Sequence, residues 1–237
     1  MLPTFFGGTF LALETSGSLG SAAVGSGPRI LSRVTLERPG GFSSGLIPAV
    51  AQALDEAGVR RADLAGVVGG AGPGSFTGVR VAAATGKGIA HALGIPFWAL
   101  SSLEAAAFAE EPAASIESER LRYVLFDARD DRVYAACYRR GPAALEERIA
   151  PHATRLGEVL ANVPSGDVRF VGDGAVRHQA AIEAAGHRVL PAPAGTPTAD
   201  ALLKLLALHP ETVPVDGAGL WEPAYLKASN AERARVV

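Results

Sequence analysis

Short apolar runs, divided by turns rich in glycine and serine, open the chain. They cover residues 9–14, 20–24 and 29–36, and the turns between them read Thr-Ser-Gly-Ser and Gly-Ser-Gly-Pro. Three strands at such close spacing are typical of an antiparallel meander.

Two helices with a buried strand between them follow this meander. Apolar positions three or four residues apart predict a helix over 44–57, which Gly58 would end. The apolar stretch 64–71 predicts a strand buried on both faces, and a second helix over 75–93 follows it after a glycine-rich turn. Residues 97–100 predict another strand, so this part of the chain forms a βαβ unit.

The second half of the chain repeats the order of the first half. A predicted strand closes on Asp127, as the first strand closes on Glu14, and a second strand follows each of them after a polar turn. This repetition predicts an α/β fold made of two similar lobes. We place the boundary in the loop 109–119, which gives lobes of residues 1–108 and 109–237. The elements expected in the second lobe are strands at 122–128, 132–138 and 168–174 and helices near 176–186 and 198–208.

The composition argues against a protein that binds nucleic acid alone. Of the 237 residues 48% are hydrophobic and only 19% are charged, which excludes extended disorder. The net charge of −2 and the pI near 6.2 leave no excess of the basic residues on which phosphate binding depends. The one cysteine, Cys137, excludes an internal disulfide, and no window is apolar enough to span a membrane. We therefore expect a cytoplasmic protein with no membrane attachment.

The segment 72–80, Gly-Pro-Gly-Ser-Phe-Thr-Gly-Val-Arg, is the most specific string in the chain. It joins a predicted strand to the start of a predicted helix. Its glycines permit close approach, Ser75 or Thr77 can cap the first amides, and a helix N-terminus attracts anions such as phosphate. The same residues also fit an ordinary βα turn. The spacing matches neither the P-loop nor the dinucleotide-binding fingerprint, which speaks against both of these nucleotide sites.

The helix predicted over 75–93 contains an unusual number of small residues. Glycine inside a helix costs about 1 kcal/mol relative to alanine, so Gly86 and Gly88 need a reason. Small residues let two backbones approach closely, either inside the fold or against another subunit. The sequence leaves both possibilities open.

Three further features of the sequence could carry chemistry. Residues 41–45 read Gly-x-Ser-x-Gly, which places Ser43 where a serine hydrolase carries its nucleophile. Pro39 and Gly40 loosen the required tight turn, and no histidine stands in a recognisable acid–histidine context, so a plain loop is the favoured interpretation. The five histidines lack metal-ligand spacing. The charged turn 127–132 indicates a solvated hairpin held by ion pairs.

Four stretches of the chain resemble the TsaB family, also called YeaZ, whose members are relatives of the larger TsaD proteins. The stretches are LALETS at 11–16, the string at 72–80, FDARDDRVY at 126–134 and PAYLK at 223–227. The string at 72–80 is highly specific, and the resemblance spans nearly the whole chain. It implies the duplicated actin-like/Hsp70-like ATPase fold, in which each lobe is similar to ribonuclease H.

The resemblance also implies an accessory role in tRNA modification. In that family the protein pairs with TsaD and with the ATPase TsaE to form threonylcarbamoyladenosine beside the anticodon, and TsaD carries the metal and the transfer chemistry. Contact with tRNA is then expected only through the complex, and a homodimer is an option for the subunit alone. No tightly bound cofactor is expected, although ADP or ATP at the interface with TsaD is compatible with the family. Peptidase activity, suggested by the older M22 glycoprotease label, is not expected.

Two departures from the family pattern bear on catalysis. The stretch 42–57 contains no histidine, whereas TsaD-type proteins hold metal with histidines on their first helix, and Phe42 stands where many members keep one. Glu14 replaces a more usual aspartate, and we expect its longer side chain to carry the carboxylate outward. Both weaken the alternative hypothesis of an autonomous, nucleotide-binding ATPase. The third hypothesis is the serine hydrolase.

The resemblance suggests two sets of residues, and none of them is catalytic or metal-binding. The predicted helices 44–57 and 75–93 are similar to those that pack against the equivalent pair in TsaD. The residues expected at this partner interface are Leu46, Ile47, Val50, Leu54, Phe76, Val79, Arg80, Ala83, Gly86 and Ala90. The residues expected to form a nucleotide or phosphate loop are Glu14, Thr15, Gly72, Gly74, Ser75, Thr77, Gly78 and Asp127.

Overall fold

The computed structural model describes residues 7–37, 42–109, 120–141, 145–216 and 221–223. Three features singled out in the sequence lie mostly outside these ranges: the turn at 39–41, the boundary loop and the PAYLK stretch. None of the helices in the described part of the chain is both long and apolar enough to cross a membrane.

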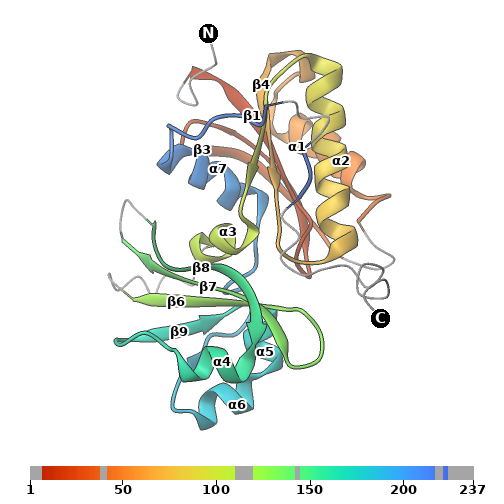
Figure 1. The fold of residues 1–237 in the computed structure, drawn as a ribbon. Coiled ribbons are helices and arrows are strands. Elements are labelled where there is room, and N and C mark those ends of the chain that lie inside the picture. The colour runs from red at the N-terminus through yellow and green to blue at the C-terminus, as the bar shows by residue number, and fades with distance from the viewer. Residues whose placement is uncertain (1–6, 38–41, 110–119, 142–144, 217–220, 224–237) are drawn as a thin grey trace.

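Two five-stranded sheets form the centre of the fold (Figure 1). The first sheet has the order β3-β2-β1-β4-β5 and the second has the order β10-β9-β6-β7-β8. The strands of the first sheet are β1 (Thr9–Glu14), β2 (Gly20–Ser26), β3 (Arg29–Leu36), β4 (Leu64–Gly70) and β5 (Phe97–Leu100). Those of the second sheet are β6 (Leu121–Asp127), β7 (Arg132–Arg140), β8 (Leu145–Arg155), β9 (Val168–Val171) and β10 (Arg188–Val189).

The two sheets share one topology. In each, the first three strands form an antiparallel meander, and the fourth strand joins the first in parallel and then pairs with the fifth in parallel. The same order, in the same directions, confirms the prediction of a duplicated α/β fold of the actin-like type. The meander predicted over 9–36 and the βαβ unit after it are confirmed as well.

Helices lie on both faces of each sheet. Figure 1 shows α1 and α2 on the outer face of the first sheet, and α4, α5 and α6 on the outer face of the second, with α3 and α7 between the sheets. The helices are α1 (Leu46–Ala57), α2 (Phe76–Leu93), α3 (Ser102–Phe108), α4 (Leu156–Ala161), α5 (Asp173–Arg177), α6 (Gln179–Ala184) and α7 (Ala199–Leu208). A short 3₁₀ turn, Arg61–Asp63, joins α1 to β4.

The two halves of the chain exchange helices. α3 follows β5 of the first sheet but packs on β6 and β7, whereas α7 follows the second sheet but packs on β1 and β2. One large core cluster therefore contains Trp98 from the first sheet, Phe126 from the second, Leu103 from α3 and Leu202 from α7. The division at residue 108 separates the two sheets but cuts through their shared packing, and as a domain boundary it stays a prediction.

Polar contacts fix α7 on the first sheet. The first helical amide, at Ala199, donates to Ser21 Oγ at 2.9 Å. Asp200 is buried, and its carboxylate lies 3.3 Å from the Arg33 guanidinium and 3.4 Å from the Lys204 ammonium. A buried carboxylate is tolerated where it is paired in this way, so these contacts define where α7 sits.

Most of the small residues of α2 face the chain's own first sheet. Ala82, Ala83 and Ala90 are buried, and a Cβ atom at Gly86 would lie 2.8 Å from Phe97 Cε2. Gly88 lies on the opposite side, where a Cβ atom would meet nothing within 4 Å. The sequence left open whether these residues pack within the fold or against another subunit. The structure shows that Gly86 packs within the fold.

We predict opposite effects of alanine at the two glycines of α2. Gly86→Ala should destabilise the fold by about 1 kcal/mol or more, because the buried Phe97 ring has no room to move. Gly88→Ala should stabilise it by up to about 1 kcal/mol, because only the helix propensity changes there. Urea unfolding of the two variants checks both signs, and equal effects would contradict the inward packing of Gly86.

Candidate functional site

The loop between β4 and α2 folds down onto the turn that follows β1. The amide of Ser75 donates to the Ser16 carbonyl at 2.8 Å, and Ser75 Oγ caps the helix by accepting from the Gly78 amide at 3.3 Å. Thr15 Oγ1 donates to the Gly78 carbonyl at 2.6 Å. The turn at 15–16 and the start of α2 thus form one hydrogen-bonded unit.

The contact between this loop and the turn after β1 explains why the loop contains glycines. A Cβ atom at Gly78 would collide with the Thr15 carbonyl oxygen, and one at Gly74 would lie 2.6 Å from the Ser16 carbonyl oxygen. Gly74 also has a φ of +156°, which residues with a side chain rarely adopt. In this chain the glycines therefore make room for the chain's own backbone.

The start of α2 faces carbonyl oxygens of the chain itself. Those of Thr15 and Ser16 lie against Gly78 and Gly74, and their partial charges oppose an anion at these two positions. The amides of Ser75 and Gly78 already donate within the chain. The predicted residues Glu14, Thr15, Gly72, Gly74, Ser75 and Gly78 are brought together, but as a packed structural element.

Glu14 lies at the centre of this element and is fully buried. Its Oε1 accepts from the Ser16 amide at 2.7 Å, and its Oε2 accepts from Ser102 Oγ, at the start of α3, at 2.7 Å. Burial raises the pKa of the Glu14 carboxyl above its usual value, and the hydrogen bonds oppose this only in part. A Cβ atom at Gly70 would collide with the carboxylate, so that glycine leaves the space that Glu14 fills. The expectation that the longer side chain points outward was wrong.

Ser102 connects Glu14 to the loop. Besides donating to Glu14, its Oγ accepts from the Gly72 amide at 3.1 Å, and its own amide donates to the Gly72 carbonyl at 2.9 Å. No local pattern singles out this serine, because it lies 88 positions from Glu14 in the chain.

Asp127, the equivalent acid at the end of β6, has a different environment. It is partly exposed, its Oδ2 accepts from Arg177 at 2.6 Å, and its Oδ1 accepts from the Arg129 amide at 2.9 Å. Asp127 belongs to the second sheet, and no hydrogen bond between it and the loop 72–78 occurs among the described residues. Asp131 lies 3.6 Å from Arg155, so the acids of the turn 127–132 pair with arginines of β8 and α5, and among the described residues no ion pair forms within the turn itself.

Asp173 is a neighbour of Asp127 that the sequence analysis did not select. Its Oδ1 accepts from the Asp127 amide at 3.1 Å and from the Gly174 amide at 2.9 Å. The sequence does contain a signal for Asp173, because Gly-Asp-Gly after β9 stands at the same place in the second sheet as Gly-Pro-Gly after β4 in the first.

Most of the residues predicted for the partner interface are buried in the chain's own core. Only Ile47 (55% exposed), Phe76 (49% exposed) and Arg80 present substantial surface, and the Arg80 guanidinium lies 3.6 Å from the centre of the Phe76 ring. The interface prediction was wrong for the buried residues, because the regular apolar period marks the side of a helix that faces its own sheet. The buried residues are Leu46, Val50, Leu54, Val79, Ala83, Gly86 and Ala90.

The outer surface of the helix pair also includes residues that the sequence analysis did not select. Ala51 follows Ile47 by one turn on α1, and Ala84 and Gly88 follow Arg80 by one and two turns on α2; all three are exposed. Thr77 is also exposed, at the start of α2. Helical spacing from an exposed neighbour would have been enough to find them in the sequence.

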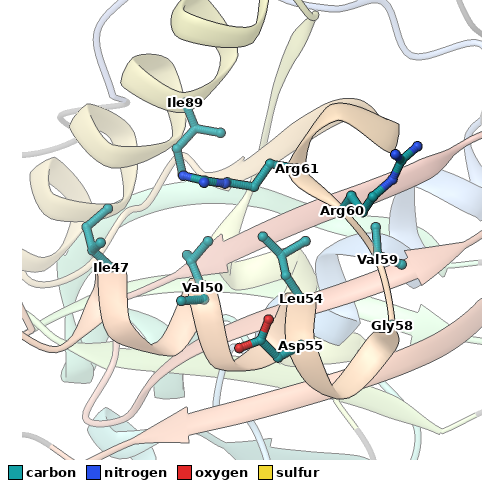
Figure 2. Close-up of a pocket in the computed structure, with 10 residues that line it drawn as sticks. Ile47, Val50, Leu54, Asp55, Gly58, Val59, Arg60, Arg61 and Ile89 are labelled. Carbon is teal, nitrogen blue, oxygen red and sulfur yellow. The ribbon is translucent and has the colours of Figure 1, made fainter.

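A groove of about 700 Å³ lies between α1 and the chain that follows it, bordered by Ile89 of α2 (Figure 2). Its lining is mainly aliphatic and includes both exposed and buried positions of the helix pair. The lining residues are Ile47, Val50, Ala51, Leu54, Asp55, Gly58, Val59, Arg60, Arg61 and Ile89.

The geometry does not support a serine nucleophile, a metal site or a reactive cysteine among the described residues. Ser43 is exposed in the turn before α1, and among the described residues no hydrogen bond joins it to a histidine. Within the same described ranges, no group of three or more His, Cys, Asp or Glu side chains is arranged to hold a metal ion. Cys137 is buried, and burial raises the pKa of its thiol to about 12.

Comparison with known proteins places the chain among tRNA-modification proteins. The family model of TsaD, tRNA N6-adenosine threonylcarbamoyltransferase, matches residues 38–234. The tRNA threonylcarbamoyladenosine biosynthesis protein TsaB of Bacillus subtilis is 32% identical over 178 residues, which cover 74% of this chain and 75% of the relative. A tRNA N6-adenosine threonylcarbamoyltransferase of Granulibacter bethesdensis is 37% identical over 121 residues, but only 32% of that longer protein is covered.

Two solved structures from Pseudomonas aeruginosa have the same fold along almost the whole chain. YeaZ superposes with a TM-score of 0.75 at 29% identity, covering 92% of this chain and all of the other. A protein described as similar to peptidase YeaZ superposes with a TM-score of 0.79 at 30% identity, covering 93% of this chain and all of the other. Together with the matches of sequence, these superpositions show that the chain belongs to the TsaB (YeaZ) family.

Proposed function

We propose that this chain is a non-catalytic subunit in the biosynthesis of threonylcarbamoyladenosine in tRNA, and that it binds and activates a catalytic TsaD-type subunit. The observation that carries the proposal is a contrast within the first lobe. The loop between β4 and α2 packs against the carbonyl oxygens of Thr15 and Ser16, while the outer faces of α1 and α2 keep exposed apolar and small residues.

The exposed face of the helix pair suits a partner made of helices. Ile47 and Phe76 offer apolar area whose burial favours association, at roughly 25 cal/mol per Å² removed from water. Ala51, Ala84 and Gly88 add little bulk between them, which allows the backbones of a second helix pair to approach closely. This face replaces the buried residues of the sequence prediction as the proposed contact with TsaD.

Further parts of the assembly belong to the same proposal. TsaE is the second protein partner, tRNA is contacted through the complex, and the isolated subunit associates with a second copy through the same face. The cytoplasm is the compartment in which these partners work. ADP or ATP takes its place at the interface with TsaD in this proposal, and the carbonyl oxygens of Thr15 and Ser16 beside the loop of this chain support that placement.

The alternative, an autonomous ATPase, fits the first lobe poorly. The Glu14 carboxylate is held by Ser16 and Ser102 and is withdrawn from any ligand in solvent. An enzyme of that class needs an acid that reaches the metal of a metal–nucleotide complex. We therefore expect no ATP turnover by the purified chain above a protein-free blank.

Binding to TsaD tests the proposal directly. The wild-type chain should form a stable complex with TsaD of the same organism in size-exclusion chromatography. Ile47→Glu should weaken the complex at least about tenfold in titration calorimetry, because it places a charge in the apolar centre of the contact. Val176→Glu is the matched control, since Val176 is an aliphatic residue of the second lobe with 41% exposure. The proposal fails if the wild-type chain and TsaD do not associate under any nucleotide condition.

The structural role of Glu14 predicts a pH dependence of stability. The folded-state pKa lies above the unfolded value of 4.5, so folding takes up a proton in the interval between the two values. The contribution of Glu14 to stability is therefore greatest below pH 4.5 and is lost as the pH rises through the folded pKa. Glu14→Gln carries no charge at this site, so its stability relative to wild type should increase from pH 5 to pH 8. Urea unfolding at both pH values checks this, and a constant difference would contradict it.

A further inference from the structure

The two sheets end in four edge strands, and three of these edges are protected against pairing with another strand. β10 is only two residues long. β8 contains Pro151, which lacks an amide hydrogen, and exposed charged residues near its start. β5 is covered by the chain that follows α7, because the Val215 amide donates to the Phe97 carbonyl at 2.8 Å. Short strands, prolines, charges and covering segments are the usual means by which proteins block sheet edges.

The fourth edge, the outer side of β3, is open in the part of the chain that the structure describes. β3 is eight residues long, pairs with β2 along its length, and contains neither proline nor lysine. No strand and no backbone hydrogen bond from the described ranges covers its other side. The charge at its centre, Arg33, is turned to α7, where Nη1 lies 3.3 Å from Asp200. The edge therefore presents a row of backbone donors and acceptors to another strand.

A second copy of the chain supplies a strand whose shape and charge match this edge. Two identical edge strands can meet in antiparallel fashion about a two-fold axis, because such a contact is self-complementary. The register that places Thr35 opposite Thr35 puts Arg33 of each copy opposite Glu37 of the other. All three side chains are exposed, and their alternate positions place them on one face of the strand.

The charges favour this register over its neighbour. Threonine pairs and pairs of opposite charge stabilise adjacent strands, whereas like charges directly opposite each other destabilise them. A register centred on Arg33 would place the two Arg33 side chains opposite each other. The guanidinium that contacts Asp200 keeps further donors for Glu37 of the second copy, since an arginine side chain has several.

We propose that the outer edge of β3 is a contact between two copies of the chain, in which the two strands pair in antiparallel fashion with Thr35 at the two-fold axis. The first sheets of the two copies then form one continuous sheet. The contact goes beyond the proposed function and is independent of it, because it uses a sheet edge and not the outer faces of α1 and α2. It is also distinct from self-association through those helices.

The experiment uses the full chain carrying Ile47→Glu, which is designed to block association through the outer face of α1 and α2. Sedimentation equilibrium of this chain should show a monomer–dimer equilibrium. Adding Thr35→Lys should raise the dissociation constant at least about tenfold, because it places like charges opposite each other at the axis. Ala153→Lys is the matched control, since Ala153 is an exposed residue of the protected edge strand β8. It should change the dissociation constant by less than about twofold.

An exchange of charge tests the register. A mixture of Thr35→Lys and Thr35→Glu chains, both carrying Ile47→Glu, should recover the dimer, because each lysine then faces a glutamate across the axis. Thermal unfolding of these variants should stay close to that of the Ile47→Glu chain, since Thr35 and Ala153 are exposed.

Three results would overturn the proposal. The Ile47→Glu chain could remain a monomer at every concentration, or it could dimerise equally well with Thr35→Lys. Loss of the dimer without recovery in the mixture would show that the strands do not meet at Thr35. Because TsaD is absent from these measurements, none of the three results affects the proposed binding of TsaD.

Discussion

The fold depends on an exchange of helices between its two halves. Each sheet has an inner apolar face that must be buried, and the helix that buries it comes from the other half of the chain: α7 covers the first sheet, and α3 covers the second. The paired carboxylate of Asp200 and the cap on Ala199 hold α7 in place by polar contacts with the first sheet. Neither half can complete its core alone, so the two lobes are bound to act as one unit.

The candidate site depends on this exchange of helices, because α3 contributes Ser102 to it. Ser102, the first residue of α3, donates to Glu14 and exchanges two further hydrogen bonds with Gly72, so the helix between the lobes also fixes the loop before α2. Since α2 starts at that loop, its position on the sheet is fixed from the same point. The rigid base is compatible with a subunit whose outer helices present a fixed surface to a partner.

Periodicity was sufficient to predict the elements that carry a strong pattern. The meander, β4, α1 and α2 were all predicted to within a few residues, because their apolar positions repeat at the period of a strand or a helix. The elements β8, α3, α4 and β10 were not predicted, and the first two escaped for physical reasons. β8 (Leu145–Arg155) is an edge strand with mostly polar residues, and α3 reads Ser-Leu-Glu-Ala-Ala-Ala-Phe, in which alanines blur any helical period. At the site, the burial of Glu14 depends on Gly70 and Ser102, which are far away in sequence. The inward face of α2 likewise depends on Phe97, and no local pattern reveals either contact.

The helix exchange also sets the order of events during synthesis. The first sheet is complete in sequence at Leu100, but the helix that covers its inner face begins only at Ala199. At a synthesis rate of about 5–20 residues per second, this sheet waits several seconds on the ribosome with its apolar face uncovered. A nascent chain in that state is a natural substrate for chaperones that bind exposed apolar surface. Production of the subunit is therefore more sensitive to chaperone supply than its finished stability alone would indicate.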